Sequence, residues 1–321
     1  MRIATFNLES LDLARDGEAA FARRAAVLRP QLEDLQADIL CLQEVNGQHV
    51  AGTSSRDLTA LTRLLAETCY DGYHLVASPA RSGEGVADVH NLVILSRRPA
   101  RESEALRHRL VPALPYRSLT AEPESARELT LEWDRPLLHA VFETEGGAAL
   151  HVINLHLRSP LAAPIPGQKL SAQTWGSVGG WAEGFFTATL KRSGQALEAR
   201  LLVERIFDAE PAALIAVCGD FNAGEEETPA RILMATAEDS GNPDLAGRAL
   251  EALELRLPED RRYSILHHGR QRMLDHILCS PALAARCRAI VADNRQLPDE
   301  AEMADDDPRS NHAPLVAEFN V

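Results

Sequence analysis

Lysine is almost missing from this sequence. Among its 321 residues the lysines are Lys169 and Lys191, so arginine supplies nearly all of the positive charge. With 47 acidic and 33 basic residues, the formal net charge is −14 at pH 7. Nonspecific nucleic-acid binding usually needs a basic surface, because phosphates must be neutralised. The composition therefore argues against a nonspecific DNA-binding protein and leaves open a nuclease with a local arginine-lined groove.

Long apolar runs and paired cysteines are missing as well. No stretch approaches the roughly 20 apolar residues of a membrane span, and the opening MRIATFNLES is typical of a strand, not of a signal peptide. The five cysteines include no C-x-x-C pair, the spacing of many zinc and redox sites. We therefore expect free thiols in a reducing compartment, with the cytoplasm as the location.

The patterning that is present belongs to an ordinary globular protein, 45% hydrophobic and 25% charged. Short apolar strand patterns alternate with helices predicted at about 17–37, 56–69 and 195–209. Strands outnumber helices and the two are interleaved, which indicates the α/β or α+β class with large sheets. We expect a single catalytic domain over residues 1–321.

An insert at about 159–194 differs in composition from the rest. It is rich in Gly, Pro, Ser and Ala, yet it contains Trp175, Trp181, Phe185 and Phe186, too many aromatic residues for a plain linker. These rings either pack the segment down, form an oligomer contact, or stack on nucleic-acid bases. The sequence slightly favours packing or an oligomer contact over stacking, and it leaves the oligomeric state open.

The stretch LIAVCGDFN at 214–222 begins as a buried strand and ends in polar residues. Side chains two apart on a strand point to the same face, so Asp220 and Asn222 share one surface while Phe221 turns into the core. An Asx-type turn that closes the strand accounts for the same pair, since Asp and Asn favour turns. Both interpretations stay open on these residues alone.

Polar residues end several other apolar strand patterns. They are Asn7 in ATFNL, Glu44 in LCLQE, His156 in INLHL, Asp275 and His276 in MLDHIL, and Asn311 and His312 before the last strand. A solvated strand end explains any one of them. It explains the set poorly, because a carboxylate at the end of a core strand is unfavourable unless it is paired or bound to a metal.

The order of these motifs carries a family resemblance. TFN, LQEV, NLVILSRRP, INLHL, GDFN, LDHIL and SNHAPL follow one another between residues 3 and 319. In this order they resemble the endonuclease/exonuclease/phosphatase superfamily, which has the DNase I-like fold. The resemblance implies an α/β (α+β) four-layer sandwich, in which two face-to-face β-sheets are flanked by helices. The site is then expected at the edge where the polar strand ends converge.

The resemblance also implies roles for the polar residues. Asp220 is similar to the residue that deprotonates the attacking water, and Asn222 to the donor that holds the phosphoryl oxygens. His156 and His312 are similar to the histidines that flank the phosphorus. Asp275 is expected to orient His312 and to raise its pKa.

A hard divalent cation is the implied cofactor. Mg²⁺ takes one or two carboxylates together with waters and substrate phosphate, and Mn²⁺ is the expected substitute. Glu44 is the natural anchor, with Asn7 close by. The family's C-terminal motif is usually S-D-H, whereas this chain has Ser310, Asn311 and His312. Asn311 therefore occupies a metal-ligand position without the carboxylate.

Further positions are expected around the site. The substrate-binding candidates are Asn91, Arg158 and Trp181. The order of the sequence suggests Glu84 or Asp88 as the acid that orients His156, and His276 is expected to be a packed or surface histidine.

These residues together predict a divalent-metal-dependent phosphoesterase that acts by in-line attack of water on a phosphodiester. A nuclease is the first expectation, with nucleic acid as the partner. A phosphodiesterase or phosphatase acting on a small phosphorylated metabolite or lipid headgroup is the alternative, which the acidic charge favours. A catalytically weakened binding protein of the same fold is the third, and Asn311 is the feature that supports it.

Overall fold

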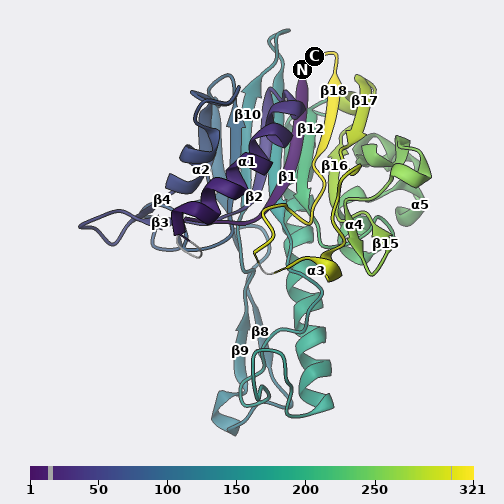
Figure 1. Cartoon of the computed structure of the whole chain (residues 1–321). Coiled ribbons are helices and arrows are strands. Elements are labelled where there is room, and N and C mark those ends of the chain that lie inside the picture. Colours follow the sequence, from purple (N-terminus) through teal and green to yellow (C-terminus); the bar gives the residue numbers. More distant parts are fainter. Residues whose placement is uncertain (14–16, 305) are drawn as a thin grey trace.

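The computed structural model describes residues 1–13, 17–304 and 306–321. Within these residues, two six-stranded sheets lie face to face (Figure 1). The first sheet contains β1 (Arg2–Leu11), β2 (Ile39–Val45), β5 (His74–Ala77), β6 (Asn91–Ser96), β17 (Cys287–Ala292) and β18 (Leu315–Phe319). The second contains β7 (Glu102–Leu106), β10 (Leu137–Glu143), β11 (Ala149–His156), β12 (Leu214–Asp220), β13 (Glu251–Ala252) and β16 (Asp275–Cys279).

Each sheet has a parallel pair at its centre. The strand order is β17-β18-β1-β2-β6-β5 in the first sheet and β13-β16-β12-β11-β10-β7 in the second. β1 runs parallel to β2, and β11 runs parallel to β12. Since parallel strands end at the same edge, the carboxyl ends of these four strands meet at one end of the sandwich.

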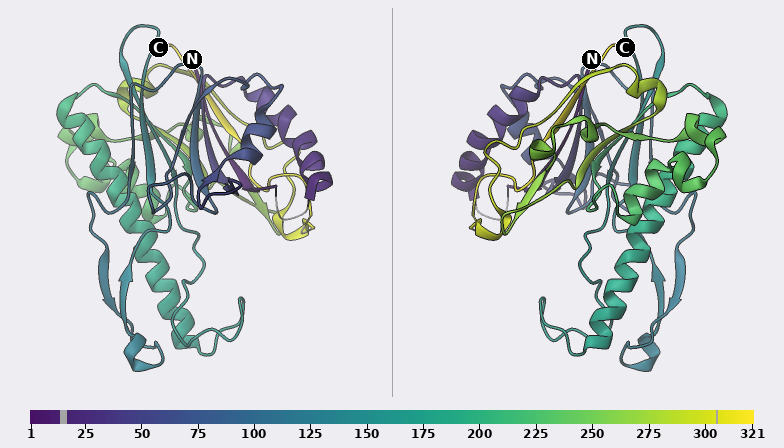
Figure 2. Two further views of the ribbon diagram at one scale, coloured as in Figure 1. Left: turned by 90° about the vertical axis from the view of Figure 1, so that its left-hand side faces the viewer. Right: turned by 90° about the vertical axis from the view of Figure 1, so that its right-hand side faces the viewer.

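Helices cover the two outer faces of the sheets, as the edge-on views show (Figure 2). The helices are α1 (Gly17–Leu35), α2 (Thr59–Leu65), α3 (Val178–Ala209), α4 (Thr228–Met234), α5 (Ala237–Ser240) and α6 (Pro281–Ala284). On α1 the buried residues are Phe21, Ala25, Leu28, Leu32 and Leu35, spaced as one helical stripe. This stripe and α2 pack on the first sheet, and α3 and α4 pack on the second.

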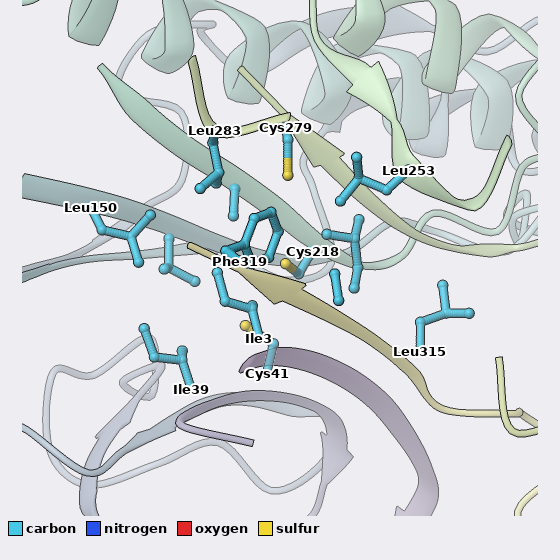
Figure 3. Close-up of a cluster of buried hydrophobic side chains, with 14 of the residues drawn as sticks. Ile3, Ile39, Cys41, Leu150, Cys218, Leu253, Cys279, Leu283, Leu315 and Phe319 are labelled. Carbon is cyan, nitrogen blue, oxygen red and sulfur yellow. The ribbon is translucent and has the colours of Figure 1, made fainter. Parts of the chain in front are cut away.

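The space between the sheets is filled by a third apolar cluster (Figure 3). Ile3 and Phe319 from the first sheet lie in this cluster with Leu150 from the second. Cys41, Cys218 and Cys279 are buried in the same cluster as free thiols. These three cysteines confirm the expectation of buried thiols, whereas Cys69 is exposed.

The predicted four-layer α/β architecture is therefore confirmed. The helix predicted at 17–37 is present as α1. The helix predicted at 56–69 is shorter, because Arg56–Asp57 forms β4 and pairs with β3 (Gln48–His49). None of the helices in the described ranges has the length and apolar sequence needed to cross a bilayer.

A long projection leaves the sandwich at the end where the parallel strands finish (Figures 1 and 2). It consists of the antiparallel pair β8 (Leu114–Arg117) and β9 (Glu128–Leu131), the outer half of α3 and the loop before α3. We call residues 110–132 and 159–190 the arm. Its exposed apolar residues are Leu119, Leu161, Leu170, Val178, Trp181, Phe185 and Phe186.

Two buried carboxylates on α3 fasten the β8–β9 segment to the helix. Glu198 accepts hydrogen bonds from the backbone N–H groups of His108 (3.1 Å), Arg109 (2.7 Å) and Leu110 (3.1 Å), and from Trp133 Nε1 (2.7 Å). These donors satisfy the oxygens of a side chain that is otherwise costly to bury.

Glu183 forms a similar attachment on α3, fifteen residues closer to the tip of the arm. It accepts from Tyr116 Oη (2.9 Å), Ser118 Oγ (3.0 Å) and the backbone N–H groups of Leu119 (2.6 Å) and Thr120 (2.9 Å). Burial alone would raise the pKa of Glu183, but these donors outweigh it and lower that pKa to about 2. The β8–β9 segment and its flanking residues are thus attached to α3 at two points.

The expected insert at 159–194 is therefore not one separate segment. Its second half, from Val178, is the outer part of a helix that continues without interruption to Ala209. Glycine inside this helix has a packing reason, since a Cβ at Gly194 would lie 2.3 Å from the ring of Trp133. Helix propensity alone disfavours such glycines. The glycines before residue 195 therefore made the predicted helix shorter than α3.

Candidate active site

Strand ends from both sheets meet at the base of the arm. His156 at the end of β11 lies opposite Asp220 at the end of β12, and Asp220 lies opposite Asp275 at the start of β16. Asn7 on β1 reaches across from the first sheet, with its Nδ2 3.0 Å from Asp220 Oδ2. Glu44 on β2 lies next to Asn7, with Oε1 3.4 Å from the same Nδ2.

Asp220 Oδ2 is surrounded by nitrogen atoms. Asn7 Nδ2 (3.0 Å) and Asn222 Nδ2 (3.1 Å) donate to it, and His156 Nε2 (3.4 Å) and His312 Nε2 (3.9 Å) lie beyond them. Asp220 Oδ1 accepts the backbone N–H of Asn222 at 2.8 Å, which is an Asx turn. Since β12 ends at Asp220, the turn interpretation holds, and the turn itself brings the Asn222 amide onto the carboxylate.

Burial changes the acidity of Asp220. The residue is 2% exposed, and this desolvation, together with the charge of Asp275, outweighs the opposing charge of His312. The result raises the pKa of Asp220 to about 7. A carboxyl group with this pKa is suited to accept a proton near neutral pH.

His312 and Asp275 form a close pair. His312 Nδ1 lies 2.7 Å from Asp275 Oδ2, and the backbone N–H of His312 donates to Ser310 Oγ at 3.1 Å. Burial alone would lower the pKa of His312, but the carboxylates of Asp275 and Asp220 outweigh it and raise that pKa to about 10. His312 is therefore a cation at neutral pH, with Nε2 directed toward Asp220.

Glu44 presents its two oxygens to different neighbours. Oε1 faces Asn7 Nδ2 (3.4 Å) and His156 Nε2 (3.6 Å). Oε2 accepts from Ser10 Oγ (3.1 Å) and lies 3.4 Å from His90 Nδ1. Burial alone would raise the pKa of Glu44, but the nearby imidazoles outweigh it and hold the pKa well below its usual value. Glu44 is therefore ionised at any pH of interest.

Arg135 adds a half-buried cation that the sequence analysis missed. Its Nη1 donates to the carbonyl oxygens of His156 (3.2 Å) and Leu157 (3.4 Å). Its charge stabilises the carboxylates of Glu44 and Asp220 and, together with burial, lowers the pKa of His156. The available signal was a charged residue, in DRP, directly before the apolar strand β10.

Backbone strain concentrates in this region. Glu9, Ser10, Glu44, His90 and Asn222 all have positive φ, between 47° and 58°. Residues with a Cβ adopt this conformation rarely, and strained residues cluster at functional sites. Gly219, next to Asp220, has φ 142°, and a Cβ there would lie 1.9 Å from the Leu155 carbonyl oxygen.

The family can now be assigned. The sequence model of the Endonuclease/Exonuclease/phosphatase family matches residues 4–297. The chain belongs to this family. As a member of the endonuclease/exonuclease/phosphatase superfamily it is a phosphoesterase, a hydrolase of phosphoester bonds. A search of curated protein sequences found no match.

Solved structures with this fold include enzymes of different substrate classes. An AP endonuclease from Archaeoglobus fulgidus superposes with TM-score 0.54 at 18% identity, covering 100% of both chains. A mannosyl-6-phosphatase from Bacteroides thetaiotaomicron gives 0.61 at 15% identity, again with 100% of both covered. TDP2 of D. rerio, complexed with single strand DNA product, gives 0.54 at 17% identity, covering 100% of this chain and 99% of the other. At these identities the likeness establishes the fold.

The family implies a divalent cation, and the residues present fit one. Ligand atoms of Glu44, His90 and His156 lie within 4.8 Å of one another, as do those of Asp220, Asp275 and His312. The observation that favours a cation is Asn311, whose Oδ1 is buried and finds no hydrogen-bond partner among the described residues.

Asn7 and Asn311 are arranged around an acid that the sequence analysis missed. The backbone N–H of Asn311 donates to Glu9 Oε2 at 2.9 Å, and Asn7 Oδ1 accepts the backbone N–H of Glu9 at 2.9 Å. Asn7 therefore turns its amide nitrogen toward Glu44, and the amide would have to turn over to bind a cation. Burial raises the pKa of Glu9. Glu9, two residues after the TFN motif, thus places a carboxylate next to position 311, where the chain itself has none.

The substrate-binding candidates lie in three different settings. Asn91 is buried, and its amide bonds to the backbone of Ala87 and Val45, so it shapes the loop and is not presented to substrate. Arg158 pairs with Asp134 beside the site. Trp181 lies on the outer half of α3, half-exposed, and stacks on Phe185 with ring centroids 5.8 Å apart.

The acids suggested for His156 lie elsewhere. Glu84 is exposed, and Asp88 pairs with Arg56 at 2.8 Å. His156 Nδ1 is buried and has no hydrogen-bond partner in the described part of the chain. His276 is buried as a packed residue, bonded through Nε2 to the Ala223 carbonyl at 2.7 Å.

Proposed function

We propose that this chain is a divalent-cation-dependent phosphodiesterase that cleaves nucleic acid by in-line attack of water. The observation that carries the proposal is Asp220, a buried carboxylate with a pKa raised to about 7. It is held by two amides and lies between His156 and His312.

Each residue of the site has a defined task in this reaction. Asp220 accepts the proton of the attacking water, while Asn7 and Asn222 fix its Oδ2. His312, kept protonated by Asp275, donates to the phosphoryl oxygens as negative charge develops. Neutral His156 offers a second contact on the other side of Asp220.

Glu44 would anchor the cation, with Asn311 Oδ1 as a further donor. When bound, a divalent cation neutralises phosphate charge and orients the scissile group. Arg135 supplies fixed positive charge in the same region, because it is bound to the backbone at His156 and Leu157.

Two observations support nucleic acid as the substrate class. The arm extends from the end of the sandwich that carries the site, and it exposes Trp181, Phe185 and Phe186 beyond it. Aromatic rings beside a phosphoesterase site are suited to stack on bases. TDP2 and a 3′ phosphatase from Neisseria, both similar in fold, are described as bound to DNA products.

A small phosphorylated molecule is the second candidate. The net charge of −14 disfavours long polyanions, and the mannosyl-6-phosphatase from Bacteroides thetaiotaomicron has the same fold. This alternative predicts a monoester or a compact diester as substrate, with no contribution from the arm.

The test compares bis(4-nitrophenyl) phosphate, 4-nitrophenyl phosphate, single-stranded DNA, duplex DNA and RNA, each with Mg²⁺ and with EDTA. Cation-dependent cleavage of the diester and of an oligonucleotide is expected. Asp220→Asn should lower the rate by about 10²–10⁴-fold, and Asp260→Asn, on the exposed surface, is the matched control. Cleavage of the monoester alone would establish the alternative, and turnover of none would overturn the proposal.

A further inference from the structure

His90 has no role in the proposed reaction, yet it lies at the edge of the cation site. Its Nδ1 is 3.4 Å from Glu44 Oε2, and its ring centroid is 6.0 Å from that of His156, with the planes at 70°. The Nδ1 atom is buried and is satisfied by no hydrogen bond within residues 1–13, 17–304 and 306–321. A buried nitrogen that lacks a well-formed hydrogen bond and faces a carboxylate oxygen is placed to bind a cation together with that oxygen.

His90 is held beside Glu44 by a backbone conformation that is unfavourable for a residue with a Cβ. His90 has φ 57° and Glu44 has φ 58°, a conformation that residues with a Cβ seldom adopt. The backbone N–H of His90 donates to Asn46 Oδ1 at 3.1 Å. The next residue, Asn91, donates to the Val45 carbonyl at 2.9 Å. These bonds hold His90 and Asn91 against the end of β2, next to Glu44.

The two sides of the Glu44 carboxylate serve different neighbours. Oε1 faces Asn7 and His156, on the side of Asp220, whereas Oε2 faces Ser10 and His90. The side chains of His90 and Glu44 are 32% and 17% exposed, so both residues reach the surface of the site. A cation on Oε2 would meet His90 Nδ1 without displacing a hydrogen bond of that nitrogen.

We propose that His90 Nδ1 is a ligand of the cation site together with Glu44, and that the site therefore prefers a borderline transition-metal ion to Mg²⁺. The inference rests on the proposed function, which places the cation at Glu44. Imidazole suits zinc, iron, nickel and copper, and affinity at nitrogen-containing sites rises from Mn²⁺ through Fe²⁺ to Co²⁺ and beyond. Mg²⁺ favours oxygen ligands and waters.

A different role for His90 predicts a different result. If His90 merely positions the Glu44 carboxylate, its removal weakens every cation by the same factor. If it binds the ion, its removal weakens ions that accept nitrogen and spares Mg²⁺. The comparison of two ions therefore separates a ligand from a positioning residue.

The experiment measures binding of Co²⁺ and of Mg²⁺ to the full chain by calorimetry, together with the visible absorption of bound Co²⁺. His90→Asn is the central variant, because Asn tolerates a positive φ and preserves the backbone. His74→Asn, an exposed histidine on β5, is the matched control. Glu44→Gln removes the carboxylate, and melting of the metal-free proteins checks that each variant is folded.

Three results are expected. The unaltered chain binds Co²⁺ more tightly than Mg²⁺. His90→Asn weakens Co²⁺ by about tenfold or more and alters its absorption spectrum, while Mg²⁺ affinity stays within about twofold. Glu44→Gln weakens both ions, and His74→Asn weakens neither.

Equal loss of both ions in His90→Asn, or unchanged Co²⁺ binding, would overturn the inference. These outcomes are independent of the test of the proposed function, which measures diester turnover. Turnover with Mg²⁺ but no effect of His90→Asn on Co²⁺ would refute the ligand assignment alone. His90-dependent Co²⁺ binding in a protein without turnover would refute the proposed function alone.

Discussion

Asp220 and His312 lie within one small volume, and both have raised pKa values. Burial raises the pKa of Asp220 to about 7, and the carboxylates of Asp275 and Asp220 raise that of His312 to about 10. At a pH between these two pKa values, Asp220 is ionised while His312 is still protonated. The pair thus defines a window of pH in which both groups are in their working state.

A bell-shaped pH profile is the first prediction. Asp220 must be ionised to accept a proton, so kcat/KM for a diester should rise with pH up to about 7. His312 must be protonated to donate, so the rate should fall near pH 10. Asp275→Asn removes the carboxylate that raises the pKa of His312, and the alkaline limb should move to lower pH. An alkaline limb at the same pH in Asp275→Asn would show that a group other than His312 determines it.

The second prediction concerns Asn311. Its backbone N–H binds Glu9, so a carboxylate at position 311 would join Glu9 beside the cation site. Two unit charges about 4 Å apart interact by roughly 4 kcal/mol at an effective dielectric near 20, and desolvation removes part of this. Asn311→Asp should therefore tighten Mg²⁺ binding several-fold, and Glu9→Gln should weaken it. Calorimetric titration of both variants measures the effect, and an unchanged affinity in both would place Glu9 and Asn311 outside the field of the ion.

At the scale of elements, α3 determines the geometry of the arm. Its inner half packs Ala196, Ala199 and Val203 against the second sheet, and its outer half carries Glu183 and the exposed aromatic rings. The β8–β9 segment is joined to it by carboxylates that accept backbone N–H groups. The arm is therefore an ordered extension of the sandwich and not a loose loop.

Glu198→Gln should test this attachment. The carboxylate is fully buried and accepts four hydrogen bonds, and an amide nitrogen in its place would face N–H donors. Hydrogen bonds to charged groups contribute about 1.5–3 kcal/mol each. We expect the free energy of unfolding to fall by about 3 kcal/mol, and proteolysis to begin within residues 107–133. Chemical denaturation measures the loss, with the exposed Glu238→Gln as control, and equal stability of the two variants would contradict the prediction.

Trp181→Ala tests the function of the outer arm. Trp181 is 46% exposed, so its removal should change little in the core. If the ring stacks on bases, binding of a single-stranded oligonucleotide should weaken by roughly 1–3 kcal/mol, while turnover of a small aryl diester stays the same. Fluorescence anisotropy and a colorimetric assay provide the two measurements. Equal losses in both would assign the ring to packing.

Over the whole molecule, the sequence predicted the features that repeat or that lie in short motifs. The apolar runs that became β2, β6, β11 and β12 were visible because both faces of these strands are buried. The polar ends of these strands indicated one shared edge, and Asp220, Asn222, His156 and Asn7 meet there.

Other features could not be seen in the sequence because they depend on contacts between distant segments. β8 and β9 are four residues each, and carboxylates on α3 hold them in place. Arg135 enters the site because it bonds to the backbone at His156, 21 residues away. His90 lies beside Glu44 because both residues adopt left-handed backbone conformations, one within β2 and one just before β6, which no periodicity reveals.

The overall charge gives a prediction about salt. A protein that makes 6–10 phosphate contacts loses about 10³–10⁵ in affinity between 50 and 200 mM salt. With a net charge of −14, repulsion at the surface is screened by the same salt and offsets part of that loss. We expect the affinity for a single-stranded oligonucleotide to fall by less than about tenfold over this range. A steep dependence would instead reveal a strongly basic groove.

The length of α3 has a mechanical consequence. Its 32 residues form a rod of about 48 Å, because each residue adds about 1.5 Å along the axis. One end of this rod lies at the tip of the arm, and the other is buried in the same cluster as Val217 and Phe221, on either side of Asp220. A load applied at the tip would therefore be transmitted along α3 to the cluster that packs beside β12, the strand that ends in Asp220.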